Sequence, residues 1–345
     1  MRTSPWSKGV LAIVLTGSVL GLAQTPPAKQ LPKPTTLSAA VLEHYQRATE
    51  LYAEYQTKCG SASDKECGSD ELNDAIEEYR VTLRLDPSFA AAHNDLGTAL
   101  DEKGETDEAI AECRKAIKLK PGFAKAHNNL GTMLDEQGMY KEAATEYRTA
   151  LRLDPSDVAA RRNLGDTLHR QGLNREAVVE YQKAIERQPD CEACYVGLGA
   201  ALTEEQRYGD AVGALRKAIE INPNTALSHY NLALALGGEG QHSEAVAEYR
   251  ETIRLDPKHE TAYENLGNLL DDGGDHQEAI VEYREALKLA PDKAMLHYNL
   301  GFALQNSGDW DGAIAAYRDA VRLGYSDFSV HYGLGFALDQ KNDLD

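Results

Sequence analysis

The feature that most constrains this chain is a sequence repeat with a period of about 34 residues. From Ala90 onward, glycine, alanine and proline each recur at this interval and stay in phase with one another. The glycine series reads Gly97, Gly131, Gly165, Gly199, Gly267, Gly301 and Gly335, and Ala233 fills its one vacancy. A unit this short cannot bury its apolar face alone, so neighbouring units must stack on one another. We therefore predict an all-α solenoid rather than a domain with one central core.

One unit, numbered from Ala124 as position 1, shows how each repeat folds. Positions 4, 7, 8 and 11 fall within about 100° of a helical wheel and predict the buried stripe of a first helix, helix A. Gly138 is expected to end helix A in a left-handed conformation. The second helix, helix B, is expected to bury Ala143, Tyr147, Ala150, Leu151 and Leu153. Glycine inside a helix is unfavourable, so we expect Gly131 to lie where helix A touches Ala143.

These residues and their spacing resemble the tetratricopeptide repeat (TPR) family over residues 38–345. The resemblance implies a right-handed superhelix of antiparallel helix pairs. We expect eight pairs, the first with an inserted loop at about 58–71, followed by a lone helix at 328–341. The seven regular units are expected to begin at Ala90, Ala124, Val158, Glu192, Ala226, Glu260 and Ala294.

The first 37 residues differ from the repeats. Residues 1–23 join a basic start to a short apolar stretch with small residues at Gly21 and Ala23, which predicts a cleaved signal peptide. An uncleaved membrane anchor is the alternative. Residues 24–37 form a proline-rich linker. We therefore expect an exported protein, periplasmic or secreted, of bacterial type.

Export would place the five cysteines in an oxidising compartment. Cys59 and Cys67 bracket the insertion of the first unit and are candidates for a disulfide. Cys191 and Cys194 form a CxxC pair, for which a local disulfide, or simply two small residues at the start of a helix, is favoured over a redox pair or half of a metal site. Cys113 takes a place that other units give to tyrosine and is expected to be buried.

Asparagine recurs at position 6 of helix A, on the side opposite the buried stripe. The residues are Asn129, Asn163, Asn231, Asn265 and Asn299, here called the asparagine ladder. An amide both donates and accepts hydrogen bonds, so the ladder is suited to hold the backbone of an extended peptide, as in the TPR superhelix of O-GlcNAc transferases that it resembles. The alternative is that each amide bonds a neighbouring helix or turn.

Other residues of the same face are expected to select the partner. The first units are acidic, the middle offers Arg162 and Arg170, and the last units offer Tyr298, Phe302 and Phe336. We expect a partner segment that is basic toward one end and apolar or aromatic toward the other. The residue set with which TPR co-chaperones clamp a C-terminal carboxylate is absent from positions 5 and 9.

The composition and motifs narrow the class of function. The net charge of -19 disfavours nucleic acid and anionic lipid as partners. The sequence has no HExxH, no GxSxG and no complete calcium loop, and we expect no catalytic residue, metal or cofactor. The histidines at position 4 are expected to be packed and hydrogen-bonded: His93, His127, His229, His297 and His331.

We therefore expect a non-enzymatic interaction scaffold that holds a peptide or partner protein in the groove lined by helix A. The alternative is the TPR region of a larger enzyme similar to the O-GlcNAc transferases, with a catalytic domain beyond Asp345.

Overall fold

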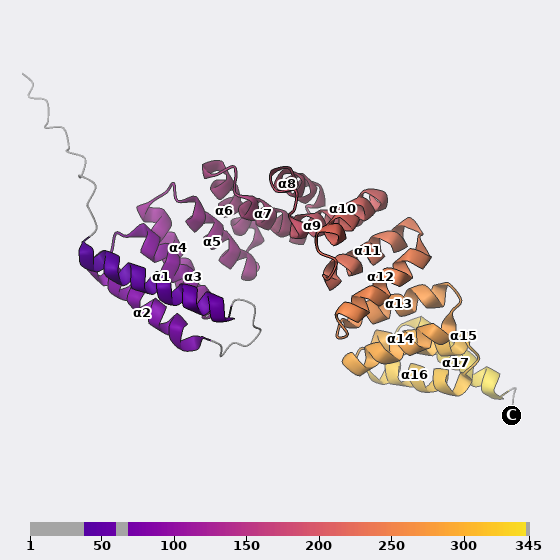
Figure 1. Cartoon of the computed structure of the whole chain (residues 1–345). Coiled ribbons are helices and arrows are strands. Elements are labelled where there is room, and N and C mark those ends of the chain that lie inside the picture. Colours follow the sequence, from indigo (N-terminus) through magenta and orange to yellow (C-terminus); the bar gives the residue numbers. More distant parts are fainter. Residues whose placement is uncertain (1–37, 60–67, 343–345) are drawn as a thin grey trace, which may run out of the picture. The chain divides into compact units, whose positions relative to one another are not determined.

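The computed structural model describes residues 38–59 and 68–342. The expected signal peptide, the linker and most of the expected insertion lie outside these residues. The described chain is all-α, and its 17 helices pack in antiparallel pairs as in a TPR solenoid (Figure 1).

The helices alternate between helix A and helix B of successive units. The A helices are α1 Ala39–Cys59, α3 Ala90–Glu102, α5 Ala124–Glu136, α7 Val158–Arg170, α9 Glu192–Glu204, α11 Ala226–Glu239, α13 Glu260–Asp272, α15 Ala294–Asn306 and α17 Phe328–Asn342. The B helices are α2 Ser69–Leu85, α4 Thr106–Leu119, α6 Tyr140–Leu153, α8 Asn174–Arg187, α10 Tyr208–Ile221, α12 His242–Leu255, α14 His276–Leu289 and α16 Trp310–Arg322. From α3 to α15, each A helix begins at the residue that the repeat register predicts.

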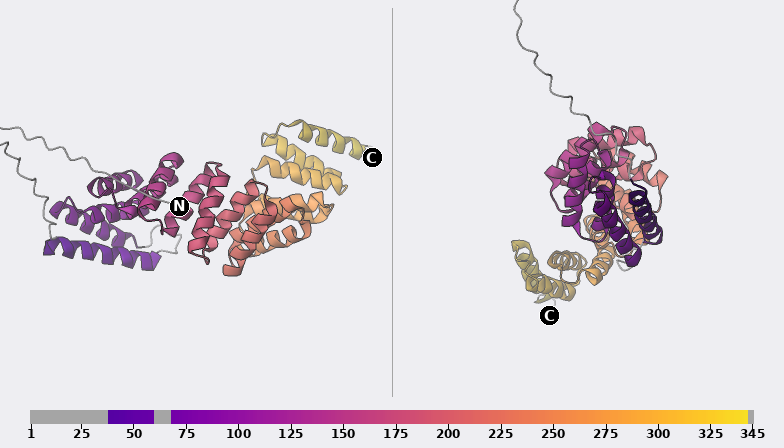
Figure 2. Two further views of the ribbon diagram at one scale, coloured as in Figure 1. Left: turned by 90° about the horizontal axis from the view of Figure 1, so that it is seen from above. Right: turned by 90° about the vertical axis from the view of Figure 1, so that its left-hand side faces the viewer.

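Each A helix from α1 to α15 packs against its own B helix, and each B helix packs against the next A helix. Successive A helices also contact one another from α3 to α11 and from α13 to α17, and a hydrogen bond from Asn265 to Tyr230 joins α13 to α11. The left view of Figure 2 shows the pairs following one another in chain order. The A helices of neighbouring units therefore form one continuous face of side chains.

The turn between helices A and B depends on a residue with positive φ. Gly138 has φ 73° and so confirms the predicted left-handed helix end. In the unit that begins at Glu192, the same position is Gln206, which adopts φ 58°. This conformation is uncommon outside glycine and asparagine, and it marks that unit as different from the others.

The seam within a unit is built around a tyrosine of helix B. A Cβ atom on Gly131 would lie 2.7 Å from Cε1 of Tyr147, so glycine makes room for the ring of helix B. The expected contact with Ala143 is not contradicted, because in the preceding unit a Cβ on Gly97 would lie 3.0 Å from the carbonyl oxygen of Ala109, the counterpart of Ala143. The expected burial of Leu153 is wrong, because this residue is 40% exposed at the end of α6.

The histidines at position 4 join three segments of the chain where they are buried. His93, His127 and His229 each place Nδ1 2.5–2.6 Å from a glutamate of helix B. Their Nε2 atoms lie 3.0–3.1 Å from the carbonyl of the proline before helix A. His297 keeps only the carbonyl contact and is half-buried. His331 is exposed, which corrects the expectation of a packed residue there, because within the described residues no helix B follows α17.

None of the helices in the described part of the chain is long and apolar enough to cross a membrane.

Candidate functional site

The candidate site is the A face, which we define as the surface formed by positions 2, 5, 6, 9, 12 and 13 of successive A helices. All five members of the asparagine ladder lie on this face and are half-buried. They are placed there because position 6 lies away from the apolar stripe that holds helix A against helix B.

Four of the ladder amides donate to the preceding A helix. Asn129 donates to Oδ1 of Asn94 and to Oγ1 of Thr98, both at 3.1 Å. The amide donor of Asn163 lies 3.5 Å from Oδ1 of Asn128, and that of Asn265 lies 3.2 Å from the hydroxyl of Tyr230. These partners occupy positions 5 and 9, so the amide nitrogens link consecutive A helices.

Position 9 connects the ladder to the core. Oδ1 of Asn268 accepts the hydroxyl of Tyr283 at 2.7 Å and the amide of Asn299 at 3.1 Å. The same tyrosine of helix B bonds position 9 in other units, as Tyr147 bonds Thr132 at 3.1 Å. The polar groups of the A face are therefore fixed in place by the buried tyrosines before any partner arrives.

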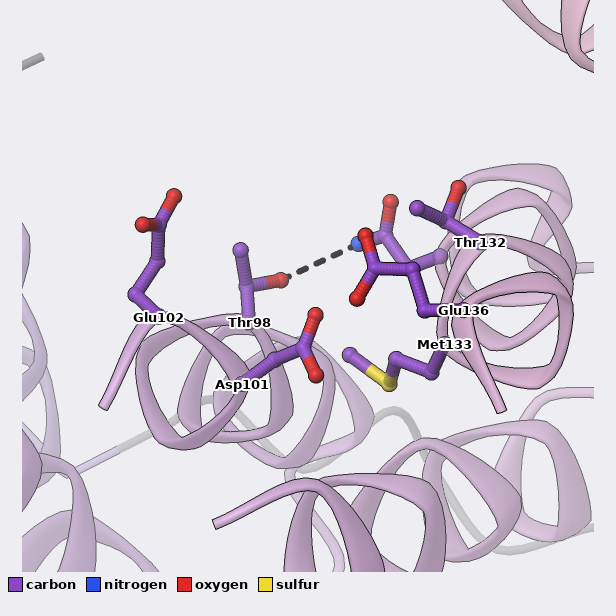
Figure 3. A pocket seen from close by; sticks show the side chains of 7 residues that line it. Thr98, Asp101, Glu102, Thr132, Met133 and Glu136 are labelled. Atoms are coloured by element: carbon purple, nitrogen blue, oxygen red, sulfur yellow. Dashed lines mark hydrogen bonds between the residues drawn. The ribbon is translucent and has the colours of Figure 1, made fainter. Parts of the chain in front are cut away.

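An acidic pocket of about 340 Å³ lies between α3 and α5 (Figure 3). Figure 3 shows the carboxyl groups of Asp101 and Glu136 close to one another, with Glu102 on the same rim. Burial is the largest cause that raises the pKa of Asp101, and Glu102 raises it further. Burial also raises the pKa of Glu136, and so do the charges of Asp101 and Glu102. Oδ1 of Asp101 is buried without a hydrogen-bond partner, so this pocket would be stabilised by a cation.

The middle of the A face carries the two predicted arginines. A pocket of about 410 Å³ brings Arg162 and Arg170 of α7 together with Val196 of α9 and Leu227 of α11. Arg170 forms an ion pair with Asp135. Asp135 also accepts the hydroxyl of Thr167 at 2.7 Å and is only 8% exposed. Asp135 occupies position 12, which the helical pattern places away from the buried stripe, but the structure shows that this residue is buried within the array.

The aromatic residues predicted for the last units lie on the A face but differ in exposure. Phe302 is 42% exposed and Phe336 is 38% exposed. The ring of Phe336 meets Trp310 edge-on, with ring centroids 5.9 Å apart. Tyr298 is half-buried between Tyr317 and Tyr325. Phe302 therefore offers the most accessible apolar surface among the three predicted residues.

The structure joins Cys191 and Cys194 by a disulfide just before and within the first turn of α9. Cys59 is also disulfide-bonded, and Cys67, the partner expected for it, lies outside the described residues. Cys113 is buried and free, and burial raises the pKa of its thiol to about 12. Within the described residues, no group of three or more histidine, cysteine or carboxylate side chains could hold a metal ion.

The unit that begins at Glu192 interrupts the asparagine ladder, as the glycine at its position 6 indicates in the sequence. The end of the Tyr181 ring occupies the space of the absent side chain, because a Cβ on Gly197 would lie 2.5 Å from Cζ of that ring. The sequence did not show that a tyrosine of the preceding unit fills this space.

Family models match most of the repeat region. They are described as "TPR repeat" at residues 133–172, 199–238 and 268–308, and as "Tetratricopeptide repeat" at residues 69–124, 112–144, 161–191, 226–259 and 294–326. These models describe the repeat in general, and none is specific to O-GlcNAc transferases. No curated protein matches the chain by sequence.

Solved structures share the fold at low sequence identity. A tetratricopeptide repeat protein from Parabacteroides merdae is 18% identical and covers 72% of this chain and 98% of its own, with a TM-score of 0.55. The Cut9-Hcn1 hetero-tetramer of APC/C is 16% identical over 87% of this chain and 63% of that one, with a TM-score of 0.57. YrrB, titled a TPR protein with an unusual peptide-binding site, is 22% identical over 54% of this chain and 96% of its own, with a TM-score of 0.48. The repeat matches cover well over half of the chain, which therefore belongs to the tetratricopeptide repeat family.

Proposed function

We propose that this protein is a non-enzymatic, exported scaffold that holds an extended peptide, or an extended segment of a partner protein, along the A face. The observation that carries the proposal is the polar network at positions 5, 6 and 9, which runs along neighbouring A helices and is anchored by buried tyrosines. A rigid, preorganised face loses little conformational freedom when a partner binds. Such a surface is suited to binding rather than to chemistry.

The ladder amides can hold a peptide backbone with their oxygen atoms, because the bonds between helices use their nitrogen atoms. In Asn129 and Asn299 the amide nitrogen bonds the preceding helix, and the carbonyl oxygen of the same side chain is an acceptor for a backbone N–H. Neighbouring A helices lie on the order of 10 Å apart, which is close to the length of three extended residues. The ladder therefore supports binding that depends little on the sequence of the peptide.

The side chains along the A face favour one orientation of the bound partner segment. The pocket at Asp101 and Glu136 favours a lysine or arginine, because a cation would offset the burial that, together with the neighbouring negative charges, raises both pKa values. Phe302 and Phe336 favour an apolar or aromatic side chain at the other end of the array. This order matches a partner segment that is basic toward one end and apolar toward the other.

Export is proposed from the sequence of residues 1–23 and from the cysteines. A local disulfide such as Cys191–Cys194 is stable in an oxidising compartment, where exported proteins reside. Fractionation of the source cells tests this part: we expect the protein outside the cytoplasm and without residues 1–23, whereas an intact, cytoplasmic chain would contradict it.

A peptide array tests the binding proposal, followed by replacement of Asn231, Asn265 and Asn299 together by alanine. We expect the variant to bind its peptides at least about tenfold more weakly, since each lost hydrogen bond is worth about 0.5–1.5 kcal/mol. The matched control replaces Thr145, Gln182 and Gln277, exposed polar residues of the B helices, by alanine. Unchanged peptide affinity in the asparagine variant, with helicity retained in circular dichroism, would contradict the ladder.

A further inference from the structure

The centre of the A face differs from the rest of the array. The pocket there is lined by three consecutive A helices, α7, α9 and α11. Its floor on α9 carries small and aliphatic residues, Val196, Gly197 and Ala200, at positions where most other units carry polar or aromatic ones. Leu227 on the α11 side is 53% exposed. An apolar floor in an otherwise polar face favours an apolar side chain of the partner.

The wall on α7 carries a cation whose hydrogen bonds are incomplete. Arg162 donates from Nη2 to Oδ1 of Asn163 at 2.9 Å, but its Nε is buried without a hydrogen-bond partner. The carboxylate of Asp166 forms a long ion pair with Arg162, 3.8 Å from Nε, and this distance is too long for a hydrogen bond. Asp166 instead accepts the hydroxyl of Tyr181 at 2.6 Å. The side chain of Arg162 is 40% exposed, so its guanidinium can take a better acceptor.

The other charges around the pocket are already engaged. Arg170 pairs with Asp135, and Glu192 accepts the hydroxyl of Ser228 at 2.8 Å. Burial, the largest influence on Asp166, raises the pKa of its carboxyl. Arg162 is therefore the cation of the pocket that still has hydrogen-bond donors to offer. Arg170 lines the same pocket, and its side chain is 52% exposed.

We propose that this pocket binds an acidic side chain, aspartate or glutamate, followed by an aliphatic or aromatic one, within an extended partner segment. A carboxylate matches the planar fork of Arg162, and the neighbouring apolar side chain covers Val196 and Leu227. The segment passes through the pocket, because the A face continues on both sides of it. This inference rests on the proposed binding function and adds the chemical class of the central contact.

Two peptide libraries test the proposal on the immobilised full-length chain. Both are N-acetylated, C-amidated dodecamers with degenerate flanks, one with a central Asp-Leu pair and one with a central Asn-Leu pair. We expect the wild type to retain the Asp-Leu library about fivefold better, as a partly exposed ion pair allows. R162Q should remove this preference, and R162E should transfer it to a Lys-Leu library. R216Q is the matched control, because Arg216 is 53% exposed on α10, pairs with Glu244 and lies off the A face.

Each other outcome overturns the inference. Equal retention of both libraries by the wild type, or a preference that survives R162Q, would show that Arg162 does not read a carboxylate. A third library has peptides that end in Leu-Asp with a free C-terminus. Stronger retention of this library would show that the pocket binds a C-terminal carboxylate rather than an internal acidic side chain. Retention of the Asn-Leu library measures the proposed binding function separately, since that library lacks the carboxylate and should still lose affinity for the asparagine variant.

Discussion

Nη1 of Arg161 donates to Oε2 of Glu180 at 2.9 Å, while its Nη2 donates to the carbonyl of Pro155 at 2.9 Å. In three other units a histidine occupies this position and meets the equivalent glutamate and proline carbonyl. A histidine donates to two acceptors only when both ring nitrogens are protonated, whereas arginine stays charged at any ordinary pH. The position therefore favours a cation that ties helix B and the inter-unit turn to helix A.

The first prediction is that the contribution of His93 and Glu112 to the free energy of unfolding has an optimum in pH. Burial acts most strongly on His93 and opposes its charge, but its bonds to Glu112 and to the Pro87 carbonyl outweigh burial and raise its pKa above 6.5. Burial likewise acts most strongly on Glu112 and opposes its charge, but the bonds from His93 and Lys115 lower its pKa below 4.5. A raised histidine pKa stabilises the fold below pH 6.5, and a lowered glutamate pKa stabilises it above pH 4.5. The pair should contribute most between these values, and urea unfolding across pH, compared with H93A, measures the window.

The second prediction separates charge from packing at the same site. H93R should match the wild type at pH 5.5 and exceed it by about 1 kcal/mol in unfolding free energy at pH 8, because only the histidine loses its proton. Urea unfolding at both pH values checks this. A difference between the two proteins that is the same at both pH values would mean that packing, not charge, sets the effect.

The third prediction concerns the two environments of the repeated glycine. G131L should lower the free energy of unfolding by about 1–3 kcal/mol, because the new side chain meets the ring of Tyr147. G335L is the matched change at the same repeat position, where the described structure places nothing within 4 Å of a new Cβ. It should stabilise α17 by about 0.5–1 kcal/mol through helix propensity. Loss of stability in both variants, measured by urea unfolding, would show that the tyrosine contact does not explain the glycine.

The fourth prediction tests the link between neighbouring A helices. Alanine at Asn268 and at Asn299, singly and together, should give a coupling energy of about 0.5–1.5 kcal/mol in a double-mutant cycle of unfolding free energies. The control pair is Asn268 on α13 and Asn129 on α5, which are several units apart and share no bond in the described structure. The coupling energy of this pair should be about zero. Equal coupling in both cycles would argue against a direct bond.

Much of the fold could be predicted because each unit repeats the same local rules. The period fixed where the A helices begin, and the glycine at position 15 marked the turn, as Gly138 shows. The opposing residue could not be predicted, because which helix B side chain meets Gly131 depends on how the two helices cross. Only the structure identifies Tyr147 there.

The candidate site was less predictable, because its side chains bond across units. A helical wheel places Asp135 on the outer side of helix A, but it does not show that Thr167 and Arg170 of the next unit cover it. It also places Asn299 on the A face without showing that Asn268 receives its amide. Contacts between units depend on the offset between neighbouring helices, which the pattern within one unit does not contain.

Site-specific crosslinking tests the central claim, binding along the A face, most directly. A photoreactive benzoylphenylalanine replaces Phe302 on the A face in one protein and Val281 on α14 in the other, residues that are 42% and 52% exposed. Each protein is irradiated with the tightest-binding peptide from the array. The account predicts a crosslinked peptide at position 302, with little or none at position 281. A crosslink at position 281 without one at position 302 would contradict it.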